Sequence, residues 1–357
     1  EQLLTSVSPL KVIFLYIESY NHLVLNLACK KAGIPTYLLE HGLRADYVYG
    51  FDPKISPQLK PSVLERGKRL FPVIRDFKAR LKTRLFLMNS LQELSQSDRE
   101  FAQHFIRVRK RHNYLETFRR ITSPKRLADN YISFSPEVYK VHQKHDDLPP
   151  EQKVFFIGIP YFDKFAAGAT RVAGNNKMVR SIILVDQPLA EQGLLQWSRD
   201  YKRSFIRGLL SVCEQYDYRL YVKPHPWQDP ELWKEQQAST TVESINDEQL
   251  LSLAPTVPIV LGFYSTYLMP FAALPHTTLI TYENHPAGRL DVSKSFIDAG
   301  VAHPIYDLEE LHEVLPRIEE IHRKQLPNKA KFTEDWLYKF DGKSGERLRD
   351  ILLSDDL

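Results

Sequence analysis

The first forty positions alternate between apolar runs and an amphipathic stretch. Residues 11–17 are mostly apolar, with β-branched and aromatic members, which is typical of a strand buried on both faces. Leu23 and Leu27 fall on one side of the helix predicted next, which Gly33 can end, and a second apolar run follows at 36–39. This order predicts a right-handed strand–helix–strand unit in a parallel sheet.

The same alternation continues through the rest of the chain. It predicts further strands at 131–134, 154–157, 181–185, 219–223, 258–261 and 278–282. It predicts helices at 195–216, 230–237, 266–274, 308–324 and 344–353. Two successive sets of strands and helices favour an α/β fold with two Rossmann-like, doubly wound domains facing a central cleft.

The 357 residues suffice for two domains of ordinary size. Gly, Ala and Asn gather at 166–180, which indicates a linker, so we expect an N-terminal domain at 1–165 and a C-terminal domain at 181–357. Residues 55–130 have a helical tendency and form a basic insertion in the first domain. The most apolar stretch, 254–282, holds four prolines, so we expect buried strands and a short helix there rather than a membrane span.

Composition and charge narrow the class of protein. Apolar residues make up 43% and charged residues 26%, as in a soluble globular protein, and the only cysteines are Cys29 and Cys213, which favours a reducing cytoplasm. Residues 66–126 hold 17 Lys and Arg against five acids, a net charge of +12 in a chain whose total is +4. This segment indicates an anionic partner, such as lipid head groups, a charged polysaccharide or nucleic acid, or more simply a solvated helix face.

Polar side chains follow five predicted strands at the point where each strand ends. They are Glu40-His41-Gly42, Asp186-Gln187-Pro188, Lys223-Pro224-His225-Pro226, Ser265-Thr266 and Glu283. Because ligands of open parallel sheets bind outside the carboxyl ends of the strands, we expect these residues to share one site.

The residue types at these strand ends suit the handling of a phosphate group. Ser265 and Thr266 begin a helix, so their hydroxyls either hold an anionic oxygen or simply cap the helix. His225 is flanked by two prolines and can donate to a phosphate oxygen, which stabilises charge on a leaving group. Glu40 can take a proton from an attacking hydroxyl, or it caps a turn.

Several familiar site motifs are absent from the sequence. It has no G-x-x-x-x-G-K-[ST] or G-x-G-x-x-G, no H-E-x-x-H, no paired C-x-x-C and no Asp-x-Asp. We therefore expect neither a P-loop NTPase, nor a nicotinamide enzyme, nor a metal site. Departure of a nucleoside monophosphate can be managed by His, Lys and hydroxyl donors without a metal.

The set of motifs resembles the metal-independent bacterial glycosyltransferases of the two-domain GT-B type that use CMP-activated sugars, namely sialyltransferases, polysialyltransferases and Kdo transferases. Their acidic-acidic-Gly, His-Pro and Ser-Ser/Thr motifs correspond to Glu40-His41-Gly42, His225-Pro226 and Ser265-Thr266. Asp186-Gln187-Pro188 is similar to a Gln-Pro element of some of these families, and residues 158–163 resemble a Gly-x-Pro-x-x-Asp element of related transferases. His41 departs from the pattern, because it stands at the second acidic position.

The resemblance implies an inverting glycosyltransferase with a CMP-sugar co-substrate, a glycan or glycolipid acceptor and no metal or other cofactor. Glu40 would deprotonate the acceptor hydroxyl, with His41 able to share the role, while His225, Ser265 and Thr266 hold the departing CMP phosphate. Further candidates for the nucleotide are Lys223, Pro226, Gln187 and Glu283, with Gly42 and Asp186 as secondary candidates.

The resemblance also implies a role in capsule or lipopolysaccharide synthesis, at the cytoplasmic face of the inner membrane. A basic helix carrying Arg75, Lys78, Arg80, Lys82 and Arg84 would contact the acceptor or anionic lipid, each charge contributing about 1 kcal/mol. We expect no nucleic acid partner, because the aromatic-interleaved basic motifs of the recognised nucleic-acid folds are absent.

Two other hypotheses about the function are compatible with the sequence. The same architecture also serves a nucleotide-sugar epimerase, or a glycerophosphotransferase of the teichoic-acid type that uses a CDP-glycerol donor. The second hypothesis is a non-enzymatic adaptor that binds an anionic polymer through residues 66–126. Its binding would weaken steeply as salt rises and would not depend on Glu40 or His225.

Overall fold

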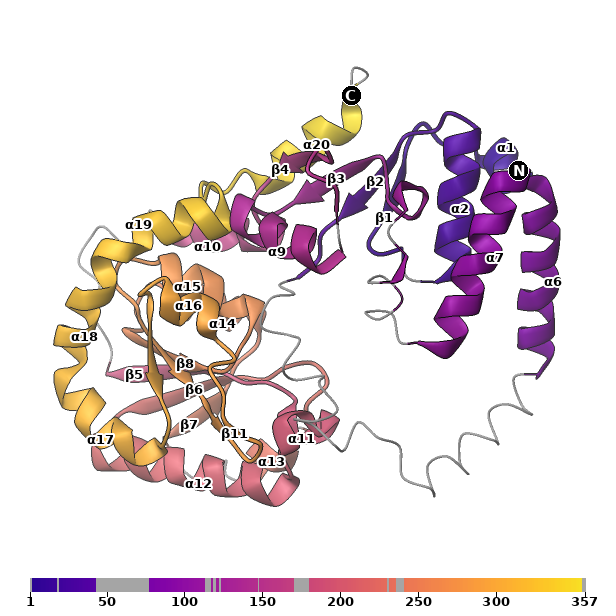
Figure 1. Ribbon diagram of the computed structural model, residues 1–357. Helices are drawn as coiled ribbons and strands as arrows, with labels where there is room; N and C mark the ends of the chain where they lie inside the picture. Colours follow the sequence, from indigo (N-terminus) through magenta and orange to yellow (C-terminus); the bar gives the residue numbers. More distant parts are fainter. Residues whose placement is uncertain are drawn as a thin grey trace. The chain divides into compact units, whose positions relative to one another are not determined.

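The chain forms two compact units, each built around a parallel sheet (Figure 1). The computed structural model describes residues 2–17, 19–42, 77–112, 117, 120–121, 123–146, 148–169, 180–229, 231–235 and 241–354. Of these, residues 2–42, 77–157 and 348–354 belong to the first unit and 158–347 to the second. The predicted fold class is confirmed, while a cleft between the units stays a prediction.

The first unit contains four parallel strands in the order β1-β2-β3-β4. They are β1 (Val12–Phe14), β2 (Thr36–Leu39), β3 (Asn130–Ser133) and β4 (Lys153–Phe156). The helical segments are α1 (Gln2–Val7), α2 (Tyr20–Lys31), α6 (Phe77–Glu93), α7 (Gln96–Arg111), η2 (Pro124–Arg126) and α9 (Pro136–Asp146). Helices α2, α6 and α7 lie side by side in Figure 1, and α2 and α7 bury Leu23, Leu27 and Phe105 in a common core.

Helix α2 begins and ends where local chemistry dictates. Ser19 accepts a hydrogen bond from the His22 N–H at 3.3 Å, which caps the first turn. Gly33 has φ +68°, the left-handed conformation that lets the chain leave the helix toward β2. The predicted strand–helix–strand unit is confirmed, although β1 is shorter than the predicted 11–17.

The second unit contains a six-stranded parallel sheet in the order β12-β9-β8-β5-β6-β7. The strands are β5 (Ser181–Val185), β6 (Arg219–Lys223), β7 (Val242–Ser244), β8 (Ile259–Gly262), β9 (Thr278–Tyr282) and β12 (Ala302–Ile305). A small hairpin pairs β10 (Asn284–His285) with β11 (Gly288–Arg289). Every residue of β5, β8 and β9 is buried, because helices cover both faces of the sheet as in a doubly wound fold.

The helices of the second unit are mostly short. They are η3 (Pro160–Phe162), α10 (Asp163–Ala169), α11 (Leu189–Gln192), η4 (Leu194–Gln196), α12 (Arg199–Gln215), α13 (Glu231–Lys234), α14 (Asp247–Leu253), η5 (Thr266–Leu268), α15 (Met269–Ala273), α16 (Lys294–Asp298), η6 (Leu308–Glu310), α17 (Leu311–Val314), η7 (Leu315–Arg317), α18 (Ile318–Gln325), η8 (Leu326–Asn328), α19 (Lys329–Phe332) and η9 (Thr333–Leu337). The helix predicted at 195–216 begins only at Arg199, because Leu195 and Gln196 have positive φ and Ser198 caps the first turn. Strands β7 and β12 and helices α14 and α16 were not predicted.

The boundaries between the units differ from the predicted 1–165, 166–180 and 181–357. Residues 158–165 group with the second unit, and α10 occupies 166–169, the start of the predicted linker; residues 170–179 lie outside the described part. Helix α20 (Ser344–Leu353) ends in the first unit, where Lys11 Nζ donates to the carbonyls of Leu352 at 2.9 Å and Ser354 at 2.5 Å. The packing of residues 348–354 on the first unit could not be predicted from the sequence, because no local pattern indicates them as partners of Lys11.

Within the described part of the chain, every helix is too short or too polar to cross a lipid bilayer. The apolar stretch 254–282 forms β8, η5, α15 and β9, as predicted.

Candidate active site

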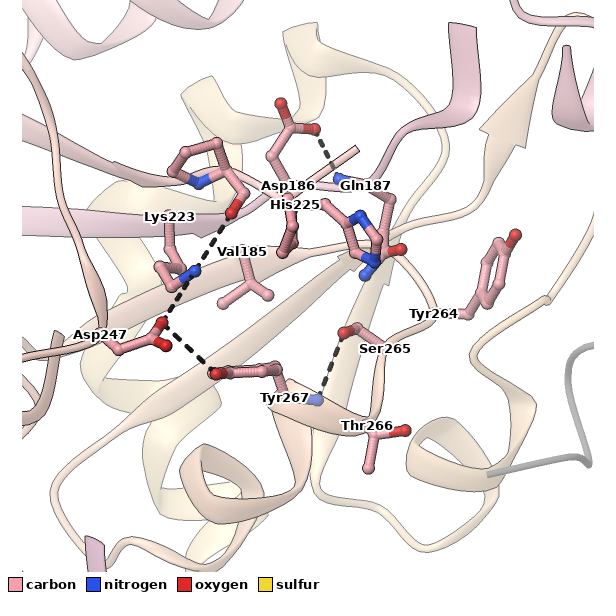
Figure 2. Close-up of a pocket in the computed structure, with 12 residues that line it drawn as sticks. Val185, Asp186, Gln187, Lys223, His225, Asp247, Tyr264, Ser265, Thr266 and Tyr267 are labelled. Atoms are coloured by element: carbon pink, nitrogen blue, oxygen red, sulfur yellow. Dashed lines mark hydrogen bonds and ion pairs between the residues drawn. The ribbon is translucent and has the colours of Figure 1, made fainter. Parts of the chain in front are cut away.

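A cavity of about 380 Å³ lies at the carboxyl edge of the second sheet. Its walls come from the segments that follow β5, β6 and β8 and from the start of α14, as Figure 2 shows. They are Val185, Asp186, Gln187, Lys223, Pro224, His225, Pro226, Asp247, Tyr264, Ser265, Thr266 and Tyr267. Because β6, β5 and β8 are neighbours in the sheet, three of the five predicted strand-end motifs meet in this cavity.

The His225 ring is held with its Nε2 proton available. The backbone N–H of Trp227 donates to His225 Nδ1 at 3.2 Å, so the neutral ring carries its proton on Nε2. Burial, and next the charge of Lys223, lowers the pKa of His225, which keeps the ring neutral at pH 7. His225 can therefore donate one hydrogen bond to a ligand oxygen.

Gln228, which the sequence did not single out, fixes the turn that carries His225. Its Oε1 accepts from the His225 N–H at 2.7 Å, and its Nε2 donates to the Gln187 carbonyl at 3.0 Å. The Gln228 N–H also donates to the His225 carbonyl at 3.0 Å. One buried side chain thus ties the segment after β6 to the segment after β5.

Lys223 faces a carboxylate that the sequence did not single out. Its Nζ lies 2.9 Å from Asp247 Oδ1, and Tyr161 Oη donates to Asp247 Oδ2 at 2.8 Å. Burial raises the pKa of Asp247, but the hydrogen bonds from Lys223 and Tyr161 outweigh it and lower the pKa below its usual value. The charge of Lys223 is therefore balanced by Asp247 at the cavity wall. The Lys223 Nζ also lies 5.4 Å from the centroid of the Tyr267 ring.

Ser265 and Thr266 stand in the wall formed after β8 and line the same cavity as His225 (Figure 2). Ser265 Oγ accepts from the Tyr267 N–H at 3.2 Å and caps η5, which is the simpler role predicted for it. A hydroxyl that accepts from a backbone N–H still has its own proton to donate. Capping and ligand binding by Ser265 are therefore compatible.

Asp186 supports the cavity from behind. Its carboxylate is 2% exposed and is paired with Lys202, and it accepts from the Trp233 indole N–H at 2.9 Å and the Gln187 N–H at 2.8 Å. These bonds satisfy the Asp186 oxygens and leave the half-buried Gln187 side chain at the cavity wall.

Glu283 lies outside the cavity lining. It is fully buried, and its Oε2 accepts from the Ser293 N–H at 3.2 Å. Burial raises the pKa of Glu283 to about 7. In this structure the carboxyl group ties the end of β9 to the segment before α16, and it does not contribute a cavity wall.

Glu40 belongs to the first unit and lies in a buried polar cluster at the end of β2. Its exposed fraction is 3%. Ser133 Oγ donates to Glu40 Oε2 at 2.5 Å, the Phe134 N–H donates to the same oxygen at 3.4 Å, and His142 Nε2 lies 2.5 Å from Oε1. Ser133 and His142 are far from Glu40 in sequence, so no local pattern indicated them.

The other members of the first motif lie beside this cluster. His41 is exposed, with its ring 6.0 Å from that of Tyr16, and Gly42 is half-buried. Since Glu40 and His225 belong to different units, their meeting in one site stays a prediction.

The predicted basic helix is only partly described. Arg75 lies outside the described residues, and Lys78, Arg80 and Arg84 belong to α6 with side chains outside the described part, while Lys82 is exposed. Among its described side chains, the same helix exposes the large apolar residues Leu81, Leu85, Phe86 and Met88. Beside the end of α7, a hollow of about 560 Å³ is lined by His104, Arg107, Val108, Arg111, His112 and Arg120.

Among the residues that the structure describes, no three His, Cys, Asp or Glu side chains lie close enough to hold a metal ion together.

Two Rossmann-like units with a polar cavity at strand carboxyl ends define the class of the molecule, an enzyme fold of the GT-B type. The structure is similar to UDP-GlcNAc 2-epimerase from Neisseria meningitidis bound to UDP-GlcNAc, with 12% identity, 99% of this chain and 79% of that chain covered, and a TM-score of 0.52. The chain belongs to the alpha-2,8-polysialyltransferase family, whose model matches residues 1–284. It is therefore a glycosyltransferase of a sialyl-transferring family.

Two other solved structures are similar to this chain at equally low identity. UDP-GlcNAc 2-epimerase from Methanocaldococcus jannaschii, in complex with UDP-GlcNAc and UDP, is 14% identical with a TM-score of 0.50, over 98% of this chain and 77% of that chain. The wall teichoic acid polymerase TagF is 10% identical with a TM-score of 0.43, over 71% of this chain and 60% of that chain. A comparison with curated proteins gave no match.

Proposed function

We propose that this protein transfers sialic acid from a CMP-activated donor to a glycan acceptor, with inversion at the anomeric carbon. The observation that carries the proposal is the cavity of the second unit, where the His225 Nε2–H and the hydroxyls of Ser265 and Thr266 line one space beside Lys223. This donor set suits a phosphate that gains charge as it leaves. The family match supports a sialyl group as the sugar.

At the donor end, the bond between the anomeric carbon and the phosphate oxygen breaks, and its electron pair stays on CMP. The neutral His225 ring donates from Nε2 to this oxygen, and the Ser265 and Thr266 hydroxyls donate to the other phosphate oxygens. Fixed donors need no reorganisation when charge develops, so they stabilise the transition state more than mobile water does.

At the acceptor end, the attacking hydroxyl oxygen forms the new bond to the anomeric carbon, and Glu40 takes its proton. Ser133, the Phe134 N–H and His142 hold the Glu40 carboxylate in one orientation. A carboxylate fixed in this way is preorganised as a base. His41, exposed next to it, is the second candidate for this role.

The basic surfaces of the first unit support an anionic acceptor and a peripheral contact with an anionic membrane. Arg107, Arg111 and Arg120 line the hollow beside the end of α7, and Lys82 stands among exposed apolar side chains on α6. Positive charge beside apolar surface suits the boundary between lipid head groups and acyl chains. Synthesis of a capsule or lipopolysaccharide glycan at the cytoplasmic face is consistent with this proposal, with sialic acid preferred to Kdo because of the family.

A panel of nucleotides tests the donor class directly. CMP should raise the melting temperature more than UMP, UDP or GDP, because a ligand that binds only the native state stabilises it. Stabilisation by CDP-glycerol but not by CMP-sialic acid would favour the glycerophosphotransferase instead, and a response to UDP-sugars alone would favour an epimerase. The rate of transfer should not change in EDTA, and a strict requirement for Mg²⁺ would contradict the proposed monophosphate leaving group.

A further inference from the structure

Trp227 presents a large apolar side chain to solvent beside the candidate active site. Its side chain is 73% exposed, whereas Trp197 and Trp233 are 1% and 4% exposed. Water solvates an indole ring poorly, and tryptophan is enriched among the residues that contribute most to binding at protein surfaces. A tryptophan exposed to this degree next to a polar cavity indicates a ligand that covers it.

The backbone that carries Trp227 is fixed. Its N–H donates to His225 Nδ1 at 3.2 Å, and the turn is closed by the bond from the Gln228 N–H to the His225 carbonyl. The indole ring meets the imidazole edge to face, with ring centroids 5.9 Å apart. Trp227 is therefore an exposed apolar surface whose backbone is tied to His225 and whose ring contacts the imidazole.

The place of Trp227 at the cavity decides which ligand group can reach it. Pro224, His225 and Pro226 line the cavity, but Trp227 does not, so its ring stands outside the rim. In a sugar nucleotide the phosphate separates the nucleoside from the glycosyl ring. If the phosphate is held at His225 with the nucleoside inside the cavity, the glycosyl ring emerges beside this imidazole.

We propose that Trp227 is the stacking platform for the glycosyl ring of the donor. One face of a pyranose ring carries mainly C–H bonds, which pack against the electron-rich face of an indole. The inference rests on the proposed function, because it takes the phosphate to lie at His225. It adds a specificity residue that recognises the ring by shape and apolar contact while leaving its polar groups to other residues.

Fluorescence quenching tests this placement on the intact protein. Trp227 is the most exposed tryptophan of the described chain, so acrylamide should quench it first, and the difference between the wild type and W227F isolates its signal. CMP alone should leave the quenching unchanged. CMP-3-fluorosialic acid, in which the fluorine slows departure of the sugar, should reduce the Trp227 quenching constant several-fold.

Kinetics provide the second readout. W227A should raise KM for CMP-sialic acid about tenfold or more, while the Kd of CMP stays within twofold. W227F keeps an aromatic face and should stay within about threefold of the wild type. W336F, which removes a tryptophan that does not line the cavity, is the matched control and should behave as the wild type.

The outcomes separate the two proposals. If CMP binds but the fluorinated donor protects Trp227 no better than CMP does, the platform is overturned while the proposed function stands. Full protection by CMP alone would place the nucleobase on Trp227 and overturn the inference as well. If no cytidine nucleotide binds the wild type, the proposed function itself fails.

Discussion

His225 is the residue whose geometry most directly supports the proposed chemistry. The Trp227 N–H occupies Nδ1 and so assigns the ring proton to Nε2, which has no hydrogen-bond acceptor among the residues that the structure describes. Replacing His225 by Ala should lower kcat by about 10²-fold or more, because one donor to the leaving oxygen is lost. Steady-state kinetics measure this effect, with the half-buried His312, away from the cavity, replaced by Ala as the control. Near-normal turnover of H225A would remove the imidazole from the mechanism.

Glu40 allows a sharper test, because Gln has the same shape and still accepts from Ser133 through its amide oxygen. E40Q should abolish transfer and leave CMP stabilisation unchanged, since the nucleotide cavity lies in the other unit. Thermal shift with CMP and an endpoint transfer assay measure the two properties separately.

H142Q provides the matched control for E40Q. If Glu40 is the base and His142 only orients it, H142Q should retain part of the activity, because the Gln amide N–H can replace the imidazole donor. A variant E40Q that loses CMP affinity, or that transfers at the wild-type rate, would show that Glu40 is not the base.

At the scale of the element, Glu283 links the end of β9 to Ser293, the residue directly before α16. Its pKa is about 7 in the folded protein and 4.5 in the unfolded chain. Below pH 4.5 Glu283 is protonated in both the folded and the unfolded state, and its full contribution to the free energy of unfolding is present. As the pH rises from 4.5 to 7 the unfolded state loses its proton first, so the free energy of unfolding should fall by about 3 kcal/mol.

E283Q should remove this pH dependence, because Gln stays neutral and still accepts from the Ser293 N–H. Urea unfolding of the wild type and of E283Q at pH 5 and pH 8 measures the difference between the two proteins, which cancels other titrating groups. Equal losses of stability in both proteins would assign the pH dependence to another group.

The elements that could be predicted from sequence are those whose limits are set locally. The strands Thr36–Leu39, Ser181–Val185, Arg219–Lys223 and Thr278–Tyr282 were predicted with their observed limits, because each apolar run stops at a proline or a polar residue. The parallel order of the strands then brought Gln187, His225 and Ser265 to one cavity.

The parts of the site that the sequence did not reveal depend on contacts between distant residues. Asp247 reaches the cavity because α14 starts after β7, a three-residue strand too short to give a pattern. Lys202 contacts Asp186 only after α12 packs on the sheet, and His142 reaches Glu40 from α9. Glu283 follows a strand as predicted, but its carboxyl group is buried toward Ser293 rather than exposed in the cavity.

At the scale of the whole molecule, the exposed apolar side chains of α6 beside Lys82 lead to a prediction about membranes. The protein should sediment with vesicles that contain phosphatidylglycerol, and binding should weaken as salt rises. The double variant L85S/F86S should bind several-fold less, because these exposed side chains would enter the lipid boundary. L326S, which replaces an exposed leucine of the second unit, is the control, and equal binding by both variants would contradict the prediction.

The return of residues 348–354 to the first unit affects how the protein can be dissected. Leu348, Ile351 and Leu352 pack on Tyr37, Ile132 and Ile157, and Lys11 holds the carbonyls at the end of the helix. An amino-terminal fragment that ends near residue 157 would lack this last helix. Its apolar surface at Tyr37, Ile132 and Ile157 would then be exposed to water, and Lys11 would lose its carbonyl acceptors. To obtain that half as a stable fragment, the last segment has to be grafted back or supplied as a separate peptide.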